Sequence, residues 1–155
     1  DDFGRILREP ENSLLKQYQA MLETEGLQIE FDSPAVDLIA EMAQRAHFFA
    51  VGDAALRYEA DAVRKHWKAA TVPAVKDLID ELSRVGTWEI AAIEAAFEAV
   101  RARHEGLALG KLAQPVRVAV TGSAASPGIF ETLALLGRER SVARLTRALS
   151  ELPAA

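Results

Sequence analysis

The sequence predicts a mainly α-helical fold, a multi-helix, bundle-like domain with one short strand near its N-terminus. Alanine, leucine, glutamate and arginine dominate the composition, and all four favour helices. Runs of β-branched residues are few, whereas apolar residues recur at the three- and four-residue spacing of a helix. Half of the 155 residues are apolar, so the chain is able to bury the core of one domain or of two small ones.

The composition also limits the possible functions. The chain contains no cysteine, which excludes a disulfide framework, a thiolate metal site and a cysteine nucleophile. No apolar run reaches the roughly 20 residues of a membrane span and no signal peptide opens the chain, so we expect a cytoplasmic protein without a membrane partner. The histidines, His47, His66 and His104, lack the spacing of metal ligands. We therefore predict no metal, no cofactor and no catalytic residue.

Two helices and a strand are predicted in the first third of the chain. A helix from Glu11 to Glu25 ends at Gly26, which suits the left-handed position after a helix. Leu27–Asp32 alternates apolar and polar residues, the period of a half-buried strand. Ser33 then caps a second helix, with Pro34 at its first position. A short strand without a partner exposes an edge, which predicts a homodimer formed through this strand or through helix exchange.

The stretch from Asp1 to about Ala43 reads DDFGRILREPENSLLKQYQAMLETEGLQIEFDSPAVDLIAEMA. It resembles the small C-terminal domain of AAA+ unfoldases of the HslU and ClpX type, and we assign residues 1–44 to this segment. The nucleotide-binding motifs of those unfoldases are absent from the sequence. The nearest phosphate-loop spacing, at residues 106–112, is one residue short and ends on Leu112 where a serine or threonine is needed, so no ATP site is predicted.

Three helices are predicted in the middle of the chain from apolar residues at helical spacing. Their ranges are Glu59–Trp67, Pro73–Val85 and Trp88–His104. Thr87 suits the N-cap of the third helix, and Gly106 stops it. We expect these helices to bury their apolar faces against one another.

The segment Gly110–Val120 is ambiguous on local grounds. It alternates like a strand, and as a helix it would hold Pro115, which is tolerated in a first turn but kinks a longer helix. Ser126 suits the N-cap of a further helix and Pro127 its first position. A last helix is predicted from Arg138 to Leu149. Its outward face is expected to carry three arginines, Arg140, Arg144 and Arg147.

Charge is distributed unevenly along the chain, whose net charge is −5. Residues 1–45 hold ten acids and four bases, and residues 46–110 hold ten acids and eight bases. Residues 111–155 hold three acids and six bases, a local net charge of +3. An acidic body with a basic end favours contact with RNA, because phosphate contacts are local. A solvated helix face is the alternative explanation of the basic end.

Two stretches in the last two thirds of the chain carry a second resemblance. AEMAQRAHFF ends a helix on paired aromatic residues, and QPVRVAVTGSAASPGIFE precedes a helix that ends in LLGRER. Residues 45–152 closely resemble the C-terminal anticodon-binding domain of bacterial glutamyl-tRNA synthetases. The resemblance favours a helix over Gly110–Val120 and implies the anticodon loop of the tRNA for glutamate as the partner. The catalytic motifs of those synthetases are absent, so we expect residues 45–155 to form a non-catalytic domain, packed as one unit with the segment before it.

The resemblance also implies a set of RNA-binding residues. Arg117 would contact an anticodon base, since an arginine offers both a donor fork and a flat cation. The pocket for the last anticodon base would be lined by Ser126, Pro127, Gly128 and Ile129, where a helix N-terminus offers backbone N–H groups. The weaker candidates for contact with backbone phosphate are Arg138, Arg140 and Arg144. For Arg117 the alternative is a half-buried arginine tied to a helix end.

Three hypotheses about function follow from the two resemblances. The first is an anticodon-binding module with a foreign N-terminal segment. The second is a folded chimera, joined within the helix near residues 37–46, that has no selected activity. The third is an unfoldase fragment that acts by protein–protein contact.

Overall fold

The computed structural model describes residues 14–28 and 33–153 of the chain. These residues form eight α-helices and two short 3-10 helices, and no strand occurs among them. The prediction of a mainly α-helical fold is therefore confirmed. Among residues 14–28 and 33–153, no helix is long and apolar enough to cross a membrane.

The chain divides into two compact units, residues 1–47 and residues 48–155. The first unit contains α2 (Leu14–Thr24) and most of α3 (Ser33–Ala50). Gly26 has a φ of 76°, and the N–H of Leu27 donates to the carbonyl of Leu22 at 3.0 Å, which closes α2 as the sequence predicts. Residues 29–32 of the expected strand lie outside the described residues, so the strand and the homodimer built on it stay predictions.

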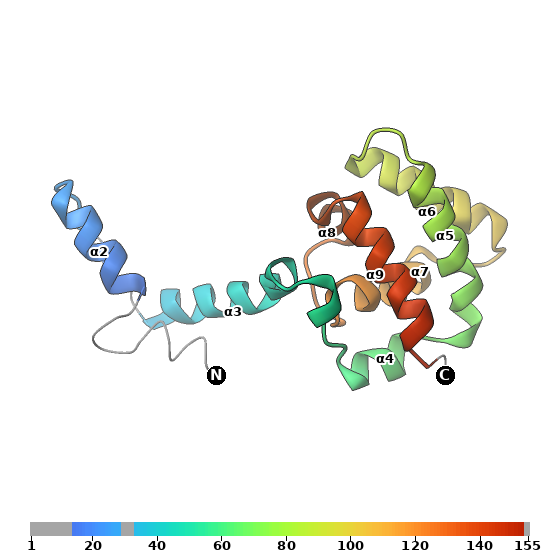
Figure 1. The fold of residues 1–155 in the computed structure, drawn as a ribbon, viewed down its shortest axis with the longest axis horizontal. Helices are drawn as coiled ribbons and strands as arrows, with labels where there is room; N and C mark the ends of the chain where they lie inside the picture. The colour runs from blue at the N-terminus through green and yellow to red at the C-terminus, as the bar shows by residue number, and fades with distance from the viewer. Residues whose placement is uncertain (1–13, 29–32, 154–155) are drawn as a thin grey trace. The chain divides into compact units, whose positions relative to one another are not determined.

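The second unit holds the remaining elements (Figure 1). In chain order they are η1 (Asp53–Ala55), α4 (Ala60–His66), η2 (Ala69–Thr71), α5 (Val72–Arg84), α6 (Ile90–Arg103), α7 (Leu109–Thr121), α8 (Ile129–Leu136) and α9 (Arg138–Glu151). The predicted ranges of the three middle helices agree with α4, α5 and α6 to within a few residues at each end.

Helix α7 lies at the centre of this unit, where it packs against α4, α5, α6, α8 and α9. Eight of its thirteen residues are buried: Leu112, Ala113, Pro115, Val116, Val118, Ala119, Val120 and Thr121. A helix that is apolar on most of its circumference must be covered on most sides. This explains why the segment 110–120 looked like a strand in the sequence, since a nearly continuous apolar run has little helical periodicity.

Two helix starts differ from the sequence prediction. Helix α8 begins at Ile129 with Gly128 as its N-cap, not at Ser126. The Ser126 hydroxyl donates to the Pro127 carbonyl at 2.9 Å instead of accepting a backbone N–H. Helix α6 begins at Ile90 after Glu89, two residues beyond the predicted N-cap Thr87. Both errors arise because several neighbouring residues suit a cap, and tertiary packing selects among them.

Candidate nucleic-acid interface

Arg117 lies on α7 beside the turn that precedes α8, as the sequence predicts. Its Nη2 atom lies 3.5 Å from the carbonyl oxygen of Pro127, the long limit of a hydrogen bond. Its Nε atom is buried and has no hydrogen-bond partner among the described residues. The side chain is half-buried. Arg117 is therefore positioned by its helix while most of its donors remain uncommitted.

The end of α7 is held in place by a close backbone contact at Gly122. Gly122 has a φ of 80°, and its carbonyl accepts the N–H of Glu59 at 2.8 Å. A Cβ atom at this position would lie 2.0 Å from the carbonyl oxygen of Arg57. Only glycine fits both the left-handed conformation and this approach. The turn that follows Gly122 is thus fixed against the segment before α4.

Hydroxyl groups order the first part of the turn. Thr121 Oγ1 donates to the Arg117 carbonyl at 2.8 Å and accepts the Ser123 N–H at 3.2 Å. The hydroxyl of Ser123 accepts the N–H of Ala125 at 3.2 Å. These local bonds replace helix bonds beyond the last turn of α7. The turn therefore presents a hydrogen-bonded backbone next to Arg117.

The four residues expected to line a base pocket have different environments. Pro127 and Gly128 are exposed, and Ser126 is half-buried. Ile129 is only 5% exposed and belongs to the hydrophobic core. The Ile129 side chain therefore packs into the core, and its place at the base pocket stays a prediction.

The sequence prediction did not include Glu131, which lies at the start of α8. A Cβ atom on Gly128 would lie 2.0 Å from Glu131 Oε2, so the carboxylate folds back over the N-cap residue. A carboxylate in the first turn interacts favourably with the positive end of the helix. The sequence contains no capping-box signal for this acid, because such a box needs a serine or threonine N-cap and the N-cap here is Gly128.

Arg144 has an internal role that the sequence prediction did not foresee. Its side chain is 0% exposed, and its donors are occupied by four acceptors. These are Asp53 Oδ1 at 2.7 Å and the carbonyl oxygens of Val120 at 2.6 Å, Phe48 at 3.0 Å and Val51 at 3.0 Å. The expectation that Arg144 faces outward is wrong. The guanidinium donates hydrogen bonds to carbonyl groups at the ends of α3 and α7, so it is not available to bind a phosphate.

Arg140 shares part of this network and remains 36% exposed. It contacts Asp53 Oδ1 at 3.1 Å and the carbonyls of Phe49 at 3.2 Å and Val51 at 2.7 Å. Burial acts to raise the pKa of Asp53, but hydrogen bonds from Arg144 and Arg140 and their charges outweigh it, so the pKa lies below its usual value. Asp53 therefore remains ionised between two arginines.

Arg138 is likewise tied to a helix end. Its Nη2 atom donates to the carbonyl of Val85 and, at 2.8 Å, to that of Gly86. Its guanidinium lies 5.6 Å from the centre of the Trp88 ring, within the range of a cation–π contact. Arg138 thus caps the C-terminal end of α5 by binding its last carbonyl groups. Contact with phosphate would be secondary to this role.

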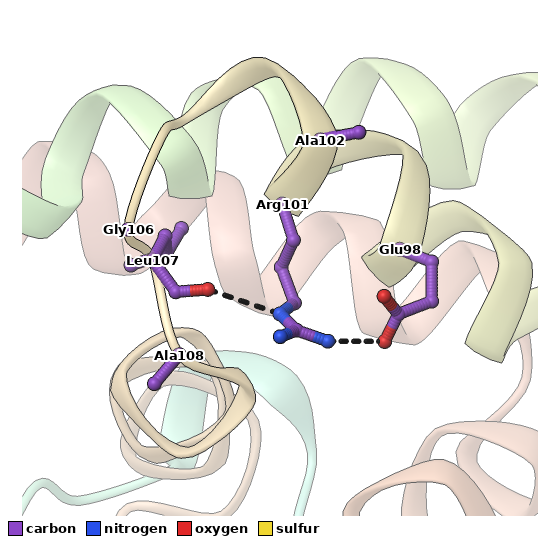
Figure 2. Close-up of a pocket in the computed structure, with 6 residues that line it drawn as sticks. All are labelled: Glu98, Arg101, Ala102, Gly106, Leu107 and Ala108. Carbon is purple, nitrogen blue, oxygen red and sulfur yellow. Dashed lines mark hydrogen bonds and ion pairs between the residues drawn. The ribbon is translucent and has the colours of Figure 1, made fainter.

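A surface depression of about 430 Å³ lies where α6 turns into α7. Figure 2 shows Arg101 at its centre, between Glu98 and the backbone of Leu107. The Arg101 Nη1 atom contacts Glu98 Oε1 at 2.5 Å, and Nε donates to the Leu107 carbonyl at 3.0 Å. Arg101 and Glu98 therefore neutralise each other in this depression. No group of three potential metal-ligating side chains occurs in the described part of the chain.

The comparisons with known proteins agree with one another. The sequence model of the anticodon binding domain matches residues 9–149. A glutamate–tRNA ligase of Thermus thermophilus is 38% identical over 122 residues, 79% of this chain and 25% of that protein. One from Magnetococcus marinus is 40% identical over 117 residues, 74% of this chain and 24% of that protein. This chain therefore spans about a quarter of these curated relatives.

A solved glutamate tRNA ligase from Elizabethkingia meningosepticum has the same fold, with a TM-score of 0.65 at 17% identity. The match covers 97% of this chain and 31% of that one. The anticodon-binding match begins at residue 9 and runs through the expected junction near residues 37–46. The separate unfoldase origin of residues 1–44, and with it the chimera, gains no support from these matches.

Proposed function

The chain belongs to the anticodon-binding domain family, and on this basis we propose that it recognises the anticodon loop of a tRNA for glutamate. Its named relatives are glutamate–tRNA ligases, of which it spans about a quarter. We propose that residues 45–155 form the recognition module and act in the cytoplasm. The module supplies binding and orientation, and the ligase chemistry belongs to other parts of such an enzyme.

The observation that supports this proposal most directly is the contrast between Arg117 and Arg144. Arg144 is completely buried and its guanidinium has four acceptors. Arg117 makes one long contact and keeps a buried Nε atom without a partner in the described structure. Arg138 shares a buried Nε without a partner with Arg117, but its Nη2 atom still donates to two carbonyls at the end of α5. The uncommitted donors of Arg117 suit the edge of an unstacked base.

The neighbouring turn completes the recognition surface. Pro127 is exposed and offers an apolar surface on which a base is able to rest. Ser126 adds a hydroxyl at the same turn. Phosphate contacts by Arg138 and Arg140 remain secondary, because Arg140 has all three guanidinium nitrogens bonded within the fold and Arg138 Nη2 already donates to two carbonyls.

A fluorescence anisotropy titration tests this function. The ligand is a labelled stem-loop RNA with the anticodon of the tRNA for glutamate, and a second RNA has an altered anticodon. We expect salt-dependent binding that prefers the matching anticodon. Arg117→Ala should lose most of this preference, and Arg117→Lys should retain some affinity without the preference, because an ammonium lacks the donor fork.

Arg84→Ala is the matched control, since Arg84 is an exposed arginine on α5. This variant should bind like the unmodified chain. Equal binding of both RNAs by the unmodified chain, or an unchanged preference in Arg117→Ala, would reject anticodon reading by this site. Cooperative unfolding without any RNA binding would instead favour a folded protein with no retained activity.

A further inference from the structure

The end of α4 carries a group of basic residues next to the helix that holds Arg117. The last turn of α4 contains Arg64, Lys65 and His66, and Lys68 follows it. Helix α4 packs against α7 (Figure 1). Arg64, Lys65 and Lys68 are exposed, and His66 is half-buried. We call Lys65, Lys68 and Arg117 the basic surface.

The charges of the basic surface have no acidic partner within the described residues. Arg64 pairs with Asp61 at 2.9 Å, but both side chains are more than three-quarters exposed, so this pair contributes little. The ammonium of Lys68 donates to the Arg64 carbonyl at 2.6 Å. No acid pairs with Lys65, Lys68 or Arg117 in the part of the chain described. The α9 arginines differ, because Arg140 and Arg144 share Asp53.

His66 reports on the electrostatic field at this position. Burial lowers its pKa, and the charges of Lys65, Arg117 and Lys68 lower it further. These three cations come from α4, α7 and the segment after α4. Cations gathered without a counter-ion repel one another in the free protein. A bound anion would remove that repulsion.

A structural explanation accounts for only part of this arrangement. Basic residues near a helix C-terminus interact favourably with the helix dipole, and Lys68 binds a terminal carbonyl of α4. This explains cations at the end of α4, but the dipole of a helix of seven residues is small. It does not account for Arg117, which lies on α7, the helix that α4 packs against.

We propose that the basic surface binds the sugar–phosphate backbone of the RNA whose base contacts Arg117. The proposal rests on the function proposed above, since it takes the same RNA as the ligand. Because α4 packs against α7, an RNA held at Arg117 would have α4 as a neighbouring surface. Contacts to phosphate fix the position of an RNA without reading its sequence. Lys65 and Lys68 would therefore supply affinity, and Arg117 would supply both affinity and selectivity.

The test is the double variant Lys65→Gln/Lys68→Gln, titrated with the matching and the altered stem-loop RNA at several salt concentrations. We expect about tenfold weaker binding of both RNAs at low salt, with the anticodon preference unchanged. The slope of log affinity against log salt concentration should fall by about 1.5, as for two lost phosphate contacts. The single variant Lys65→Gln should show about half of this change in slope, and it leaves the Lys68 contact intact.

The control is Lys76→Gln/Arg84→Gln, which removes the same charge from exposed positions of α5. It should change affinity less than twofold, and thermal melting checks that every variant is folded. If the unmodified chain reads the anticodon but the α4 variants behave like the control, the basic surface is not a phosphate site and the proposed function stands. If the unmodified chain does not bind the RNA, both proposals are wrong.

Discussion

Arg144 and Arg117 show how one residue type serves two purposes within a single unit. Arg144 joins the ends of α3 and α7 through Phe48, Val51 and Val120, which lie in separate parts of the sequence. These carbonyls would otherwise be buried without donors, which costs about 1–3 kcal/mol for each group. Arg117 does not satisfy helix ends in this way. Its Nε atom is instead buried without a hydrogen-bond partner among the described residues.

The stability of the protein should fall in acid because of Asp53. The folded pKa of Asp53 lies below its ordinary value of 3.8. The folded state therefore binds fewer protons than the unfolded state, and ionised Asp53 contributes stability above pH 3.8 that is lost as pH falls through the folded pKa. Urea unfolding at a series of pH values measures this loss.

The control for this measurement is Asp53→Asn, which cannot ionise. The variant should be less stable than the unmodified chain at neutral pH, because Arg140 and Arg144 lose their shared carboxylate. The difference in free energy of unfolding between the two proteins should shrink as pH falls below 3.8. A difference that stays constant down to pH 2 would contradict a pKa set by these arginines.

The helices differ in how far the sequence predicts them. The middle helices follow from apolar periodicity, because each has one buried face and one exposed face, as α5 shows with Ala74, Val75, Leu78 and Leu82 buried. Helix α7 could not be distinguished from a strand by periodicity, since it is buried on most sides. Its Pro115 lies in the helix interior, where proline removes a backbone bond and normally disrupts a helix. The surrounding helices stabilise α7 against this cost.

Partners that are distant in sequence could not be predicted from spacing. Arg144 and Asp53 are separated by 91 positions, so no local pattern identifies Asp53 as its partner. Arg117 and the turn at residues 126–128 were brought together by the resemblance to the synthetase domain and not by spacing, and Arg117 Nη2 lies 3.5 Å from the Pro127 carbonyl oxygen. The sequence did not predict the basic surface, because the net charge of residues 46–110 is −2. Averaging over a segment conceals cations that the fold brings together from two helices.

The contact between Gly122 and Arg57 predicts a difference between two glycine substitutions. Gly122 and Gly137 have similar positive φ values, 80° and 84°, so an alanine side chain is strained at both. Only at Gly122 would the new Cβ meet backbone, 2.0 Å from the Arg57 carbonyl oxygen. Nothing lies within 4 Å of a Cβ at Gly137.

We expect Gly137→Ala to cost about 1–3 kcal/mol, because its φ of 84° with a ψ of 159° is a conformation essentially restricted to glycine. Gly122→Ala should cost more, because the chain near Arg57 must move in addition to the left-handed strain at Gly122. Urea unfolding measures both values, and the RNA titration should show weaker binding only for Gly122→Ala, whose turn carries the recognition surface. Equal destabilisation by the two substitutions would mean that the backbone at Arg57 shifts at little energetic cost.

The charge of the whole molecule conceals its proposed function. A net charge of −5 argues against a general nucleic-acid binder, since a negative molecule repels phosphate at long range. Recognition of one RNA loop requires only a local cation surface, and the described interface lies entirely in the unit of residues 48–155. The acidic residues elsewhere would then suppress binding to unrelated nucleic acid while the loop is read at short range.

Because every interface residue discussed above lies in the second unit, a chain of residues 45–155 should fold and bind RNA by itself. It keeps Phe48, Val51 and Asp53, the partners of Arg144. We expect cooperative thermal unfolding and an affinity for the matching stem-loop within about twofold of the full chain, since phosphate and base contacts are local. The matched control begins at Ala54 and lacks those partners, so the buried Arg144 guanidinium is left uncompensated and the fold should be lost. If residues 45–155 fold but bind at least tenfold more weakly, the first 44 residues contribute directly to RNA recognition.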